Sequence, residues 1–335
     1  MLDIITVGTI TKDIFLSGID RAQTINFQKR PYIGLPLGAK LKVENIITNY
    51  GGSALNTAIS FSRQGLKVGL ISLNCIGKTS QDILQVLRDD KISNGLLDLK
   101  SLKELPLSTI LVEENGERTI LNYRDASYNW PKDIFTKKKL DAKIIIVGSL
   151  NGQKEIWQSL LKQKKAKQFT LAANPGRGDL DIFKKNPHWL KDIDVLFLNR
   201  EEGAYLTNKK YSQWLNIFKA LDRLVPGIIV MTDGDKGALA SNGKNIWQVG
   251  AIKPKTQVEK TGAGDAFLSG FVYGLQKNHS HLLAEWRNQD IEEALRYGTI
   301  NAYNVVRFVG ASTGLFAYAH LPKTIYQSVK IKMVD

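Results

Sequence analysis

The chain has 335 residues, with 46 Lys and Arg against 32 Asp and Glu, which gives a formal charge of +14 at pH 7. Its single cysteine excludes an intramolecular disulfide, its four histidines lack zinc-ligand spacing, and no apolar run is long enough to span a bilayer. The basic residues are dispersed and no nucleic-acid reader motif accompanies them, so we expect a cytoplasmic globular protein without a nucleic-acid or membrane partner.

Short β-branched runs alternate with helical patterns along most of the chain. The strands predicted from these runs are Ile4–Val7, Val68–Leu73, Lys143–Val147, Phe169–Ala172, Val195–Leu198 and Ile228–Met231. The predicted helices are Ala54–Gln64, Ser80–Arg88, Lys154–Lys164 and Trp214–Leu224. This alternation predicts an α/β fold, a three-layer α/β/α sandwich with a mainly parallel central sheet, in which ligands bind at the carboxyl ends of the strands.

Two segments interrupt this alternation, Phe15–Thr48 and Leu107–Tyr123. The second predicts a β-hairpin, because Ser108–Glu113 and Arg118–Tyr123 flank the turn-forming sequence Glu-Asn-Gly-Glu. We expect segments near residues 12–48 and 107–125 to form a small β-sheet lid on a single domain that spans residues 1–335. Exposed strand edges on such a lid would favour a homodimer.

The segment Lys260–Phe271 carries the strongest chemical signal. Its apolar residues continue at helical spacing: Phe267, Leu268, Phe271, Val272 and Leu275. A helix that begins at Gly262, Ala263 and Gly264 offers free backbone N–H groups and a positive dipole end to a phosphate. Asp265 in its first turn can accept a proton from an attacking hydroxyl, although a tight turn followed by a helix cap gives the same pattern.

Thr261–Phe267 resembles the C-terminal signature of the ribokinase-like (PfkB) carbohydrate kinases, Asp-Thr-x-Gly-Ala-Gly-Asp-x-Phe, and Gly51–Ala58 is similar to the family's Gly-Gly-x-x-x-Asn-x-Ala. The resemblance implies an ATP- and Mg²⁺-dependent kinase. It makes Asp265 the catalytic base and the backbone of Gly262, Ala263 and Gly264 the anion hole.

A sugar-binding role is predicted for the N-terminal signature. Gly51 and Gly52 would let the backbone approach a polyhydroxylated ligand, and the amide of Asn56 would bind its hydroxyls. Asp13 is similar in placement to the family's substrate-binding Asp. The alternatives are a loop before a capped helix for the first three residues and a surface turn for Asp13.

A nucleotide site is implied by three further resemblances. Asn199 to Glu202 is similar to the family's Asn-x-x-Glu motif, so Glu202 would organise Mg²⁺ through water, unless it only favours the helix dipole. Thr232 and Gly234 would contact ATP. Asn301 corresponds to a position near the adenine pocket, or else packs between helices.

Departures from the family pattern affect the predicted substrate and ion. Glu259 and Lys260 stand where the family usually has Asp-Thr, in a loop implicated in monovalent-cation activation, so Lys260 could make K⁺ unnecessary. Ser53 replaces the lysine of ribokinases, so a nucleoside is the alternative to a sugar as acceptor. Tyr123, Arg124, Tyr128 and Trp130 lie just beyond the lid hairpin and could stack on a nucleobase, or the aromatic ones could form lid core. A non-enzymatic nucleotide- or sugar-binding regulatory protein is the alternative outside the enzymes.

Overall fold

The computed structural model describes residues 1–28, 30–113, 117–124, 128–254, 259–277, 286–315 and 323–334. Within these residues the largest sheet has nine strands in the order β17-β16-β15-β14-β13-β12-β11-β1-β6. Its parallel part comprises β6 (Val68–Ile71), β1 (Leu2–Val7), β11 (Ala142–Val147), β12 (Thr170–Ala173), β13 (Val195–Asn199) and β14 (Ile228–Thr232). The predicted strands and their parallel pairing are therefore confirmed.

An antiparallel extension completes this sheet beyond β14. It is formed by β15 (Ala238–Ser241), β16 (Ile246–Val249) and the C-terminal strand β17 (Ile331–Val334). The predicted strand Val68–Leu73 is divided at Ser72, after which β7 (Leu73–Cys75) pairs with β8 (Asp98–Leu102).

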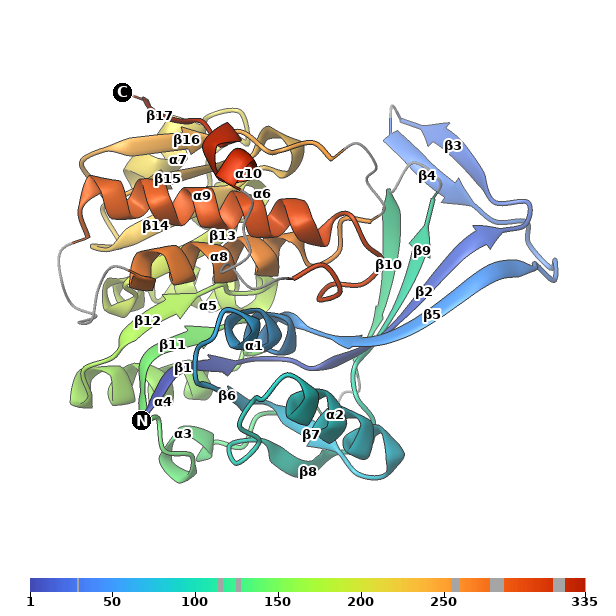
Figure 1. Cartoon of the computed structure of the whole chain (residues 1–335), viewed down its shortest axis with the longest axis horizontal. Coiled ribbons are helices and arrows are strands. Elements are labelled where there is room, and N and C mark those ends of the chain that lie inside the picture. Colours follow the sequence, from blue (N-terminus) through green and yellow to red (C-terminus); the bar gives the residue numbers. More distant parts are fainter. Residues whose placement is uncertain are drawn as a thin grey trace.

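Helices cover both faces of the sheet, which confirms the three-layer architecture (Figure 1). One face carries α1 (Ser53–Arg63), α8 (Ala263–Lys277) and α9 (Asn288–Val305). The other carries α4 (Lys154–Ala166), α5 (Arg177–Lys185), α6 (Arg200–Thr207) and α7 (Trp214–Leu221). The shorter segments are α2 (Lys78–Asp89), α3 (Ile134–Lys137), α10 (Lys323–Ser328) and the 3₁₀ turns Pro187–Asp192 and Gly234–Lys236.

The parallel strands are mostly apolar because both of their faces are covered. Every residue of β6 and β12 is buried, and so are the first four residues of β13 and β14. The polar residues Asn199 and Thr232 end β13 and β14, where the strands leave the core. No helix in the described part of the chain combines the length and apolarity needed to cross a bilayer.

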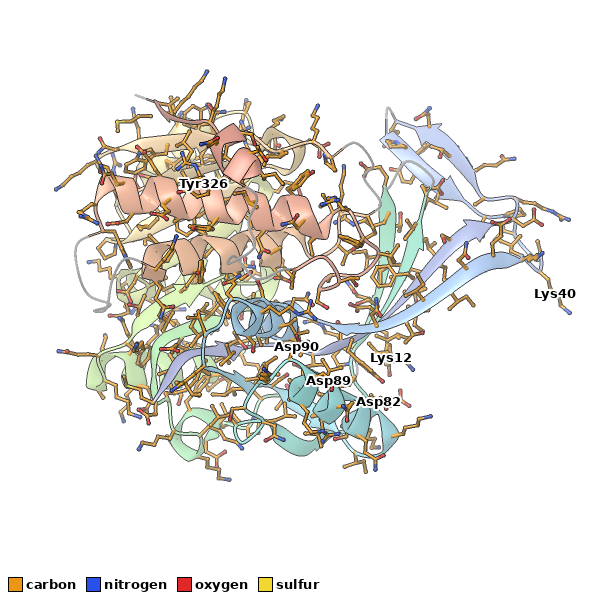
Figure 2. The ribbon with its side chains drawn as sticks, in the orientation of Figure 1. Lys12, Lys40, Asp82, Asp89, Asp90 and Tyr326 are labelled. Carbon is orange, nitrogen blue, oxygen red and sulfur yellow. The ribbon has the colours of Figure 1, made fainter. Side chains whose placement is uncertain are left out.

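The small sheet projects from one edge of this body (Figure 1). Its strands are β10 (Arg118–Tyr123), β9 (Leu107–Val112), β2 (Thr11–Ile19) and β5 (Val43–Gly51), in that order. The predicted hairpin is confirmed, since β9 and β10 pair antiparallel; residues 114–116 of its turn lie outside the described residues. A second hairpin, β3 (Gln23–Phe27) with β4 (Arg30–Gly34), extends the projection, and Figure 2 shows Lys12 near its base and Lys40 at its far end. We call this projection the lid.

Candidate active site

Two neighbouring cavities open at the carboxyl ends of the parallel strands. The smaller, of about 300 Å³, is lined by Thr9, Thr11, Asp13, Gly52, Ser53, Asn56, Ser108, Ile110, Ile120, Asn122, Arg124, Ser149, Asn174, Pro175, Gly176, Glu202, Thr261, Gly262 and Asp265. The larger, of about 380 Å³, is lined by Arg118, Asn199, Thr232, Gly234, Asp235, Gly237, Ala251, Ile252, Lys253, Pro254, Lys260, Ala263, Gly264, Phe267, Thr299, Ala302, Tyr303 and Val306. We call them the lid-side cavity and the strand-end cavity.

The start of α8 lies at the boundary between the cavities. Gly262 and Asp265 line the lid-side cavity, whereas Ala263 and Gly264 line the strand-end cavity. A Cβ added at Gly264 would meet no atom within 4 Å, so a ligand has room to approach its backbone. This helix terminus can therefore present N–H groups to a phosphate that bridges the two cavities.

Asp265 is held by a residue from the other predicted motif. Asn56 Nδ2 donates a hydrogen bond of 2.8 Å to Asp265 Oδ2, which joins two residues 209 positions apart in the chain. Burial is the largest effect on the pKa of Asp265 and raises it, the Asn56 hydrogen bond lowers it, and the charge of Asp13 raises it, so that the pKa is about 6. A carboxyl with such a pKa is ionised at neutral pH and is basic enough to accept a proton there.

Asp13 lies on β2, in the wall that the lid contributes to the same cavity. Its Oδ1 accepts a hydrogen bond of 2.8 Å from Thr11 Oγ1, and its side chain is buried. Burial raises the pKa of Asp13, and hydrogen bonds from Thr11 and Ser108 partly oppose this. Two carboxyl groups from the lid and from α8 thus face one small cavity.

The glycines of the N-terminal motif serve the protein's own packing. A Cβ at Gly51 would lie 2.2 Å from Asp13 Oδ2, and Gly51 does not line either cavity. Gly52 has φ +94°, and a Cβ there would lie 2.4 Å from the carbonyl oxygen of Thr9. The prediction that Gly51 contacts the ligand is therefore corrected, because this glycine makes room for the Asp13 carboxylate; Gly52 does line the lid-side cavity.

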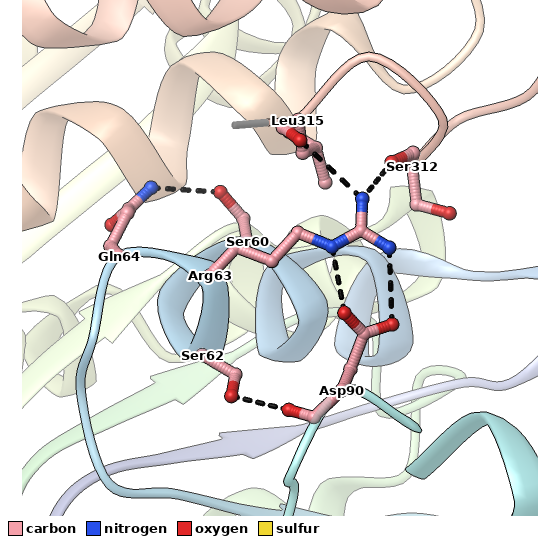
Figure 3. Close-up of polar contacts among 7 residues, drawn as sticks. All are labelled: Ser60, Ser62, Arg63, Gln64, Asp90, Ser312 and Leu315. Atoms are coloured by element: carbon pink, nitrogen blue, oxygen red, sulfur yellow. Dashed lines mark hydrogen bonds and ion pairs between the residues drawn. The ribbon is translucent and has the colours of Figure 1, made fainter. Parts of the chain in front are cut away.

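Gly262 is likewise constrained by packing, in its case against residues 310–315. It has φ +80°, and a Cβ there would lie 2.6 Å from the backbone of Ala311. The segment that carries Ala311 is tied down by Arg63 at the end of α1, whose Nη1 donates to the carbonyl oxygens of Ser312 (2.8 Å) and Leu315 (3.4 Å). The same guanidinium binds both oxygens of the Asp90 carboxylate. Its Nε donates to Oδ1 at 2.7 Å and its Nη2 donates to Oδ2 at 3.1 Å (Figure 3).

Asn199 and Glu202 form a reciprocal cap at the start of α6. Asn199 Oδ1 accepts from the Glu202 N–H at 2.8 Å, and Glu202 Oε2 accepts from the Asn199 N–H at 2.7 Å. Burial raises the pKa of Glu202, an effect that the hydrogen bond from Asn199 opposes. Asn199 also lines the strand-end cavity and Glu202 the lid-side cavity, so the cap leaves both side chains next to ligand space.

Of the remaining predicted nucleotide contacts, Thr232 and Gly234 line the strand-end cavity and Asn301 does not. Asn301 is fully buried, and its amide donates to Ser60 Oγ, the Ala266 carbonyl and Ser269 Oγ. The prediction for Asn301 is corrected to helix packing, because the turn of α9 presents its neighbours to the cavity instead. These neighbours are Thr299, Ala302, Tyr303 and Val306.

Several lining residues were not predicted from the sequence. Ser149 and Asn174 follow β11 and β12, and a search for polar residues after buried strands would have found them. Ser108 and Asn122 come from β9 and β10, where the pairing of the lid strands had to be known first. By contrast, Tyr128 and Trp130 are buried with their ring centroids 6.4 Å apart, and both belong to the main hydrophobic core rather than to a core of the lid.

Residues 23–315 match the pfkB family of carbohydrate kinases. The cytidine kinase of Thermococcus kodakarensis is 26% identical over 78% of this chain and 89% of its own length, and the 5-dehydro-2-deoxygluconokinase of Listeria monocytogenes is 25% identical over 76% and 80%.

A similar solved structure is the ribokinase of Cryptococcus neoformans in complex with ADP. It has a TM-score of 0.71 and 19% identity, and the likeness covers 98% of this chain and 99% of that one. With the fold, the paired cavities and the family match taken together, the chain belongs to the pfkB family of carbohydrate kinases and is a phosphotransferase that acts on a hydroxyl group.

Proposed function

We propose that this protein transfers the γ-phosphoryl group of ATP to a hydroxyl of a sugar or sugar derivative, with Asp265 as the general base. The observation that carries the proposal is the position of Asp265. It lies where α8 separates the two cavities, it is oriented by Asn56, and burial raises its pKa to about 6. A base at this boundary would meet both the acceptor hydroxyl and the donor phosphate.

In this proposal the acceptor occupies the lid-side cavity. Asp13 accepts hydrogen bonds from two of its hydroxyls, and Asp265 accepts the proton of the hydroxyl that attacks. The backbone N–H groups of Gly262, Ala263 and Gly264 stabilise the charge on the transferring phosphoryl group, since they lie at the positive end of α8. Direct transfer leaves ADP and the phosphorylated acceptor.

The nucleotide occupies the strand-end cavity in this arrangement. Thr232 and Gly234 are the proposed contacts of its phosphates or ribose, and Lys260 adds positive charge beside them. Mg²⁺ would neutralise the phosphates when bound, and Glu202 fits a role in holding its water ligands. One Glu202 oxygen is engaged by the Asn199 N–H, and its carboxylate still faces the cavity.

The lining of the lid-side cavity favours a sugar over a nucleoside. Its described lining contains no aromatic side chain, and the predicted stacking residues Tyr128 and Trp130 are buried in core instead. Hydroxyl, amide and carboxyl groups predominate, which suits an acceptor with many hydroxyls. A volume of about 300 Å³ lies at the lower end of the usual range for ligand sites, of about 300–1,000 Å³.

Two finer proposals concern the protein in solution. A cytoplasmic location suits its single, buried, free cysteine. We also infer that the lid pairs two copies of the chain. Its edge strand β5 exposes Ile46 and Ile47 by 65% and 40%, and the β3–β4 hairpin exposes Ile25, Phe27 and Tyr32.

The test is Mg²⁺- and ATP-dependent ADP release across a panel of sugars, sugar derivatives and nucleosides, with Asp265→Asn beside the native protein. We expect turnover with a sugar or sugar derivative and a loss of about 10² to 10⁴ in kcat in the variant. Turnover with nucleosides alone would show that the acceptor is a nucleoside and not a sugar or sugar derivative. ATP binding without turnover on any acceptor would favour a nucleotide-binding regulatory protein.

A further inference from the structure

The lid-side cavity contains a cationic side chain that the proposed chemistry does not use. Arg124 follows directly after β10 and lines this cavity together with Asn122 from the same strand. Its Nη1 donates a hydrogen bond of 3.1 Å to Asn151 Oδ1, a neutral oxygen. Among the described residues, no carboxylate forms an ion pair with Arg124 within 4.0 Å.

The acidic side chains of the lid-side cavity do not neutralise the charge of Arg124. The described acidic residues that line the cavity are Asp13, Glu202 and Asp265, and none of the three forms an ion pair with Arg124 within 4.0 Å. The charge of Arg124 acts on Tyr128, whose pKa burial raises and Arg124 partly lowers. The guanidinium is bonded to Asn151, which follows β11, whereas Asp265 lies in the first turn of α8, so the two groups come from different parts of the cavity wall.

A guanidinium is suited to a particular kind of ligand. Its planar fork binds a carboxylate or a phosphate through two parallel N–H···O bonds, whereas a neutral sugar hydroxyl needs no such group. Neutral donors and acceptors also line this cavity, among them Asn122, Ser149 and Asn174. These groups can complete the hydrogen bonds of an anion, and the formal charge of +14 favours its approach.

We propose that the acceptor is itself an anion, a small polyhydroxylated molecule whose carboxylate or phosphate monoester binds Arg124 while one of its hydroxyls faces Asp265. This inference rests on the proposed sugar-kinase function and names its substrate class. Phosphorylation adds a second anionic group to the acceptor, and Arg124 holds the first.

Binding without ATP tests the inference independently of turnover. Calorimetry would compare gluconate with glucose and fructose 6-phosphate with fructose, on the native protein and on Arg124→Gln. We expect at least one anion to bind more tightly than its neutral partner by about 10- to 100-fold, and Arg124→Gln to remove that preference. Gluconate and fructose 6-phosphate distinguish a carboxylate ligand from a phosphate ligand.

Two controls isolate the guanidinium. Arg124→Lys keeps the charge and loses the fork, so it should recover only part of the preference. Arg88→Gln removes the same charge from α2, outside both cavities, and should leave the preference unchanged.

Kinetics separate this inference from the proposed function. With an anionic acceptor, Arg124→Gln should raise KM by about 10-fold or more and leave kcat within about threefold. Equal binding of charged and neutral ligands to the native protein overturns the inference. So does a fall in kcat that is the same for every acceptor, because Arg124 would then act on the transferring phosphoryl group. Absence of turnover with intact anion preference would instead count against the proposed function alone.

Discussion

Asp265 shows how the position of a carboxyl group, rather than the residue type, changes its pKa. The carboxyl is ordinary, but its desolvation in the first turn of α8 disfavours the charged form and raises its pKa, while the Asn56 hydrogen bond limits the rise. The nearby charge of Asp13 acts in the same direction as burial. Two motifs that are separated by about two hundred residues in the sequence thus set the basicity of one group.

This pKa predicts the acid side of the pH–rate profile. In the proposed mechanism Asp265 acts as a carboxylate, so we expect activity above its folded-state pKa and a loss of activity as the pH falls through that value. We expect kcat/KM to be halved near pH 6 and to fall about tenfold for each further pH unit. Steady-state rates between pH 4.5 and 8.5, in buffers of constant ionic strength, would measure this.

Asn56→Ala provides the internal check on that profile. Loss of its hydrogen bond to the charged form should move the midpoint to higher pH. A midpoint near pH 4 in the native protein would mean that Asp265 is not desolvated when it acts. An unchanged midpoint in the variant would show that another group titrates.

The same residues show how far sequence reasoning reached. Asp13, Asn56 and Asp265 were predicted from motifs, and the structure brings them to one cavity. Gly51 and Asn301 belong to the same patterns but contact the protein itself, at Asp13 and at Ser60. A pattern records that a residue type is needed, and only the packing tells whether a ligand or a neighbouring side chain needs it.

At the scale of elements, the parallel strands were predicted well because burial on both faces gives continuous apolar runs. The extension β15 to β17 was missed, since its strands have only four residues each and β17 joins the sheet from the far end of the chain. The lid hairpin β9–β10 was predicted correctly from the turn-forming sequence between its strands. Its parallel pairing with β2 was not, because residues about 95 positions apart in sequence form it.

The edge strand β5 carries a prediction about assembly. Sedimentation velocity should show a dimer for the native protein, and Ile46→Asp should shift it to monomer, because a charge would be buried at the paired lid. Met333→Asp is the matched control, since Met333 is also an exposed apolar residue, 50% exposed, on the edge strand β17 of the other sheet. A native monomer, or a dimer that persists in Ile46→Asp and dissociates in Met333→Asp, would exclude the lid as the interface.

At the scale of the whole molecule, the lid and the body meet beside the strand-end cavity. Lys260, just before α8, forms ion pairs with Glu117 of the lid at 2.6 Å and with Asp235 of the body at 3.4 Å. The residues next to Glu117 and Lys260 form a second ion pair between the lid and the body. In this pair Arg118 Nε lies 3.6 Å from the buried carboxylate of Glu259. At the base of the lid, Tyr50 Oη donates to Asp82 Oδ2 at 2.8 Å, which ties β5 to α2.

Lys260 accordingly supplies a fixed positive charge at the start of α8. Its pKa is raised by the hydrogen bond to Glu117, against an opposing effect of desolvation, and the charges of Glu117 and Asp235 raise it further, so the ammonium stays charged throughout the working pH range. A charge bound to the chain at this place would perform the electrostatic role that a dissolved monovalent cation could otherwise perform. We therefore expect the native rate to be the same, within about twofold, in K⁺ and in tetramethylammonium buffers.

The variant Lys260→Thr tests whether the lysine replaces the cation, because threonine is the residue usual in the family at this position. The variant should lose about 10- to 10³-fold in kcat in tetramethylammonium and should recover part of it when K⁺ is added. Glu117→Gln is the control, since it breaks the ion pair to the lid but leaves the lysine charged and in place. Strong stimulation of the native protein by K⁺ would show that Lys260 does not replace the ion. Equal losses in Lys260→Thr and Glu117→Gln would assign Lys260 to holding the lid instead.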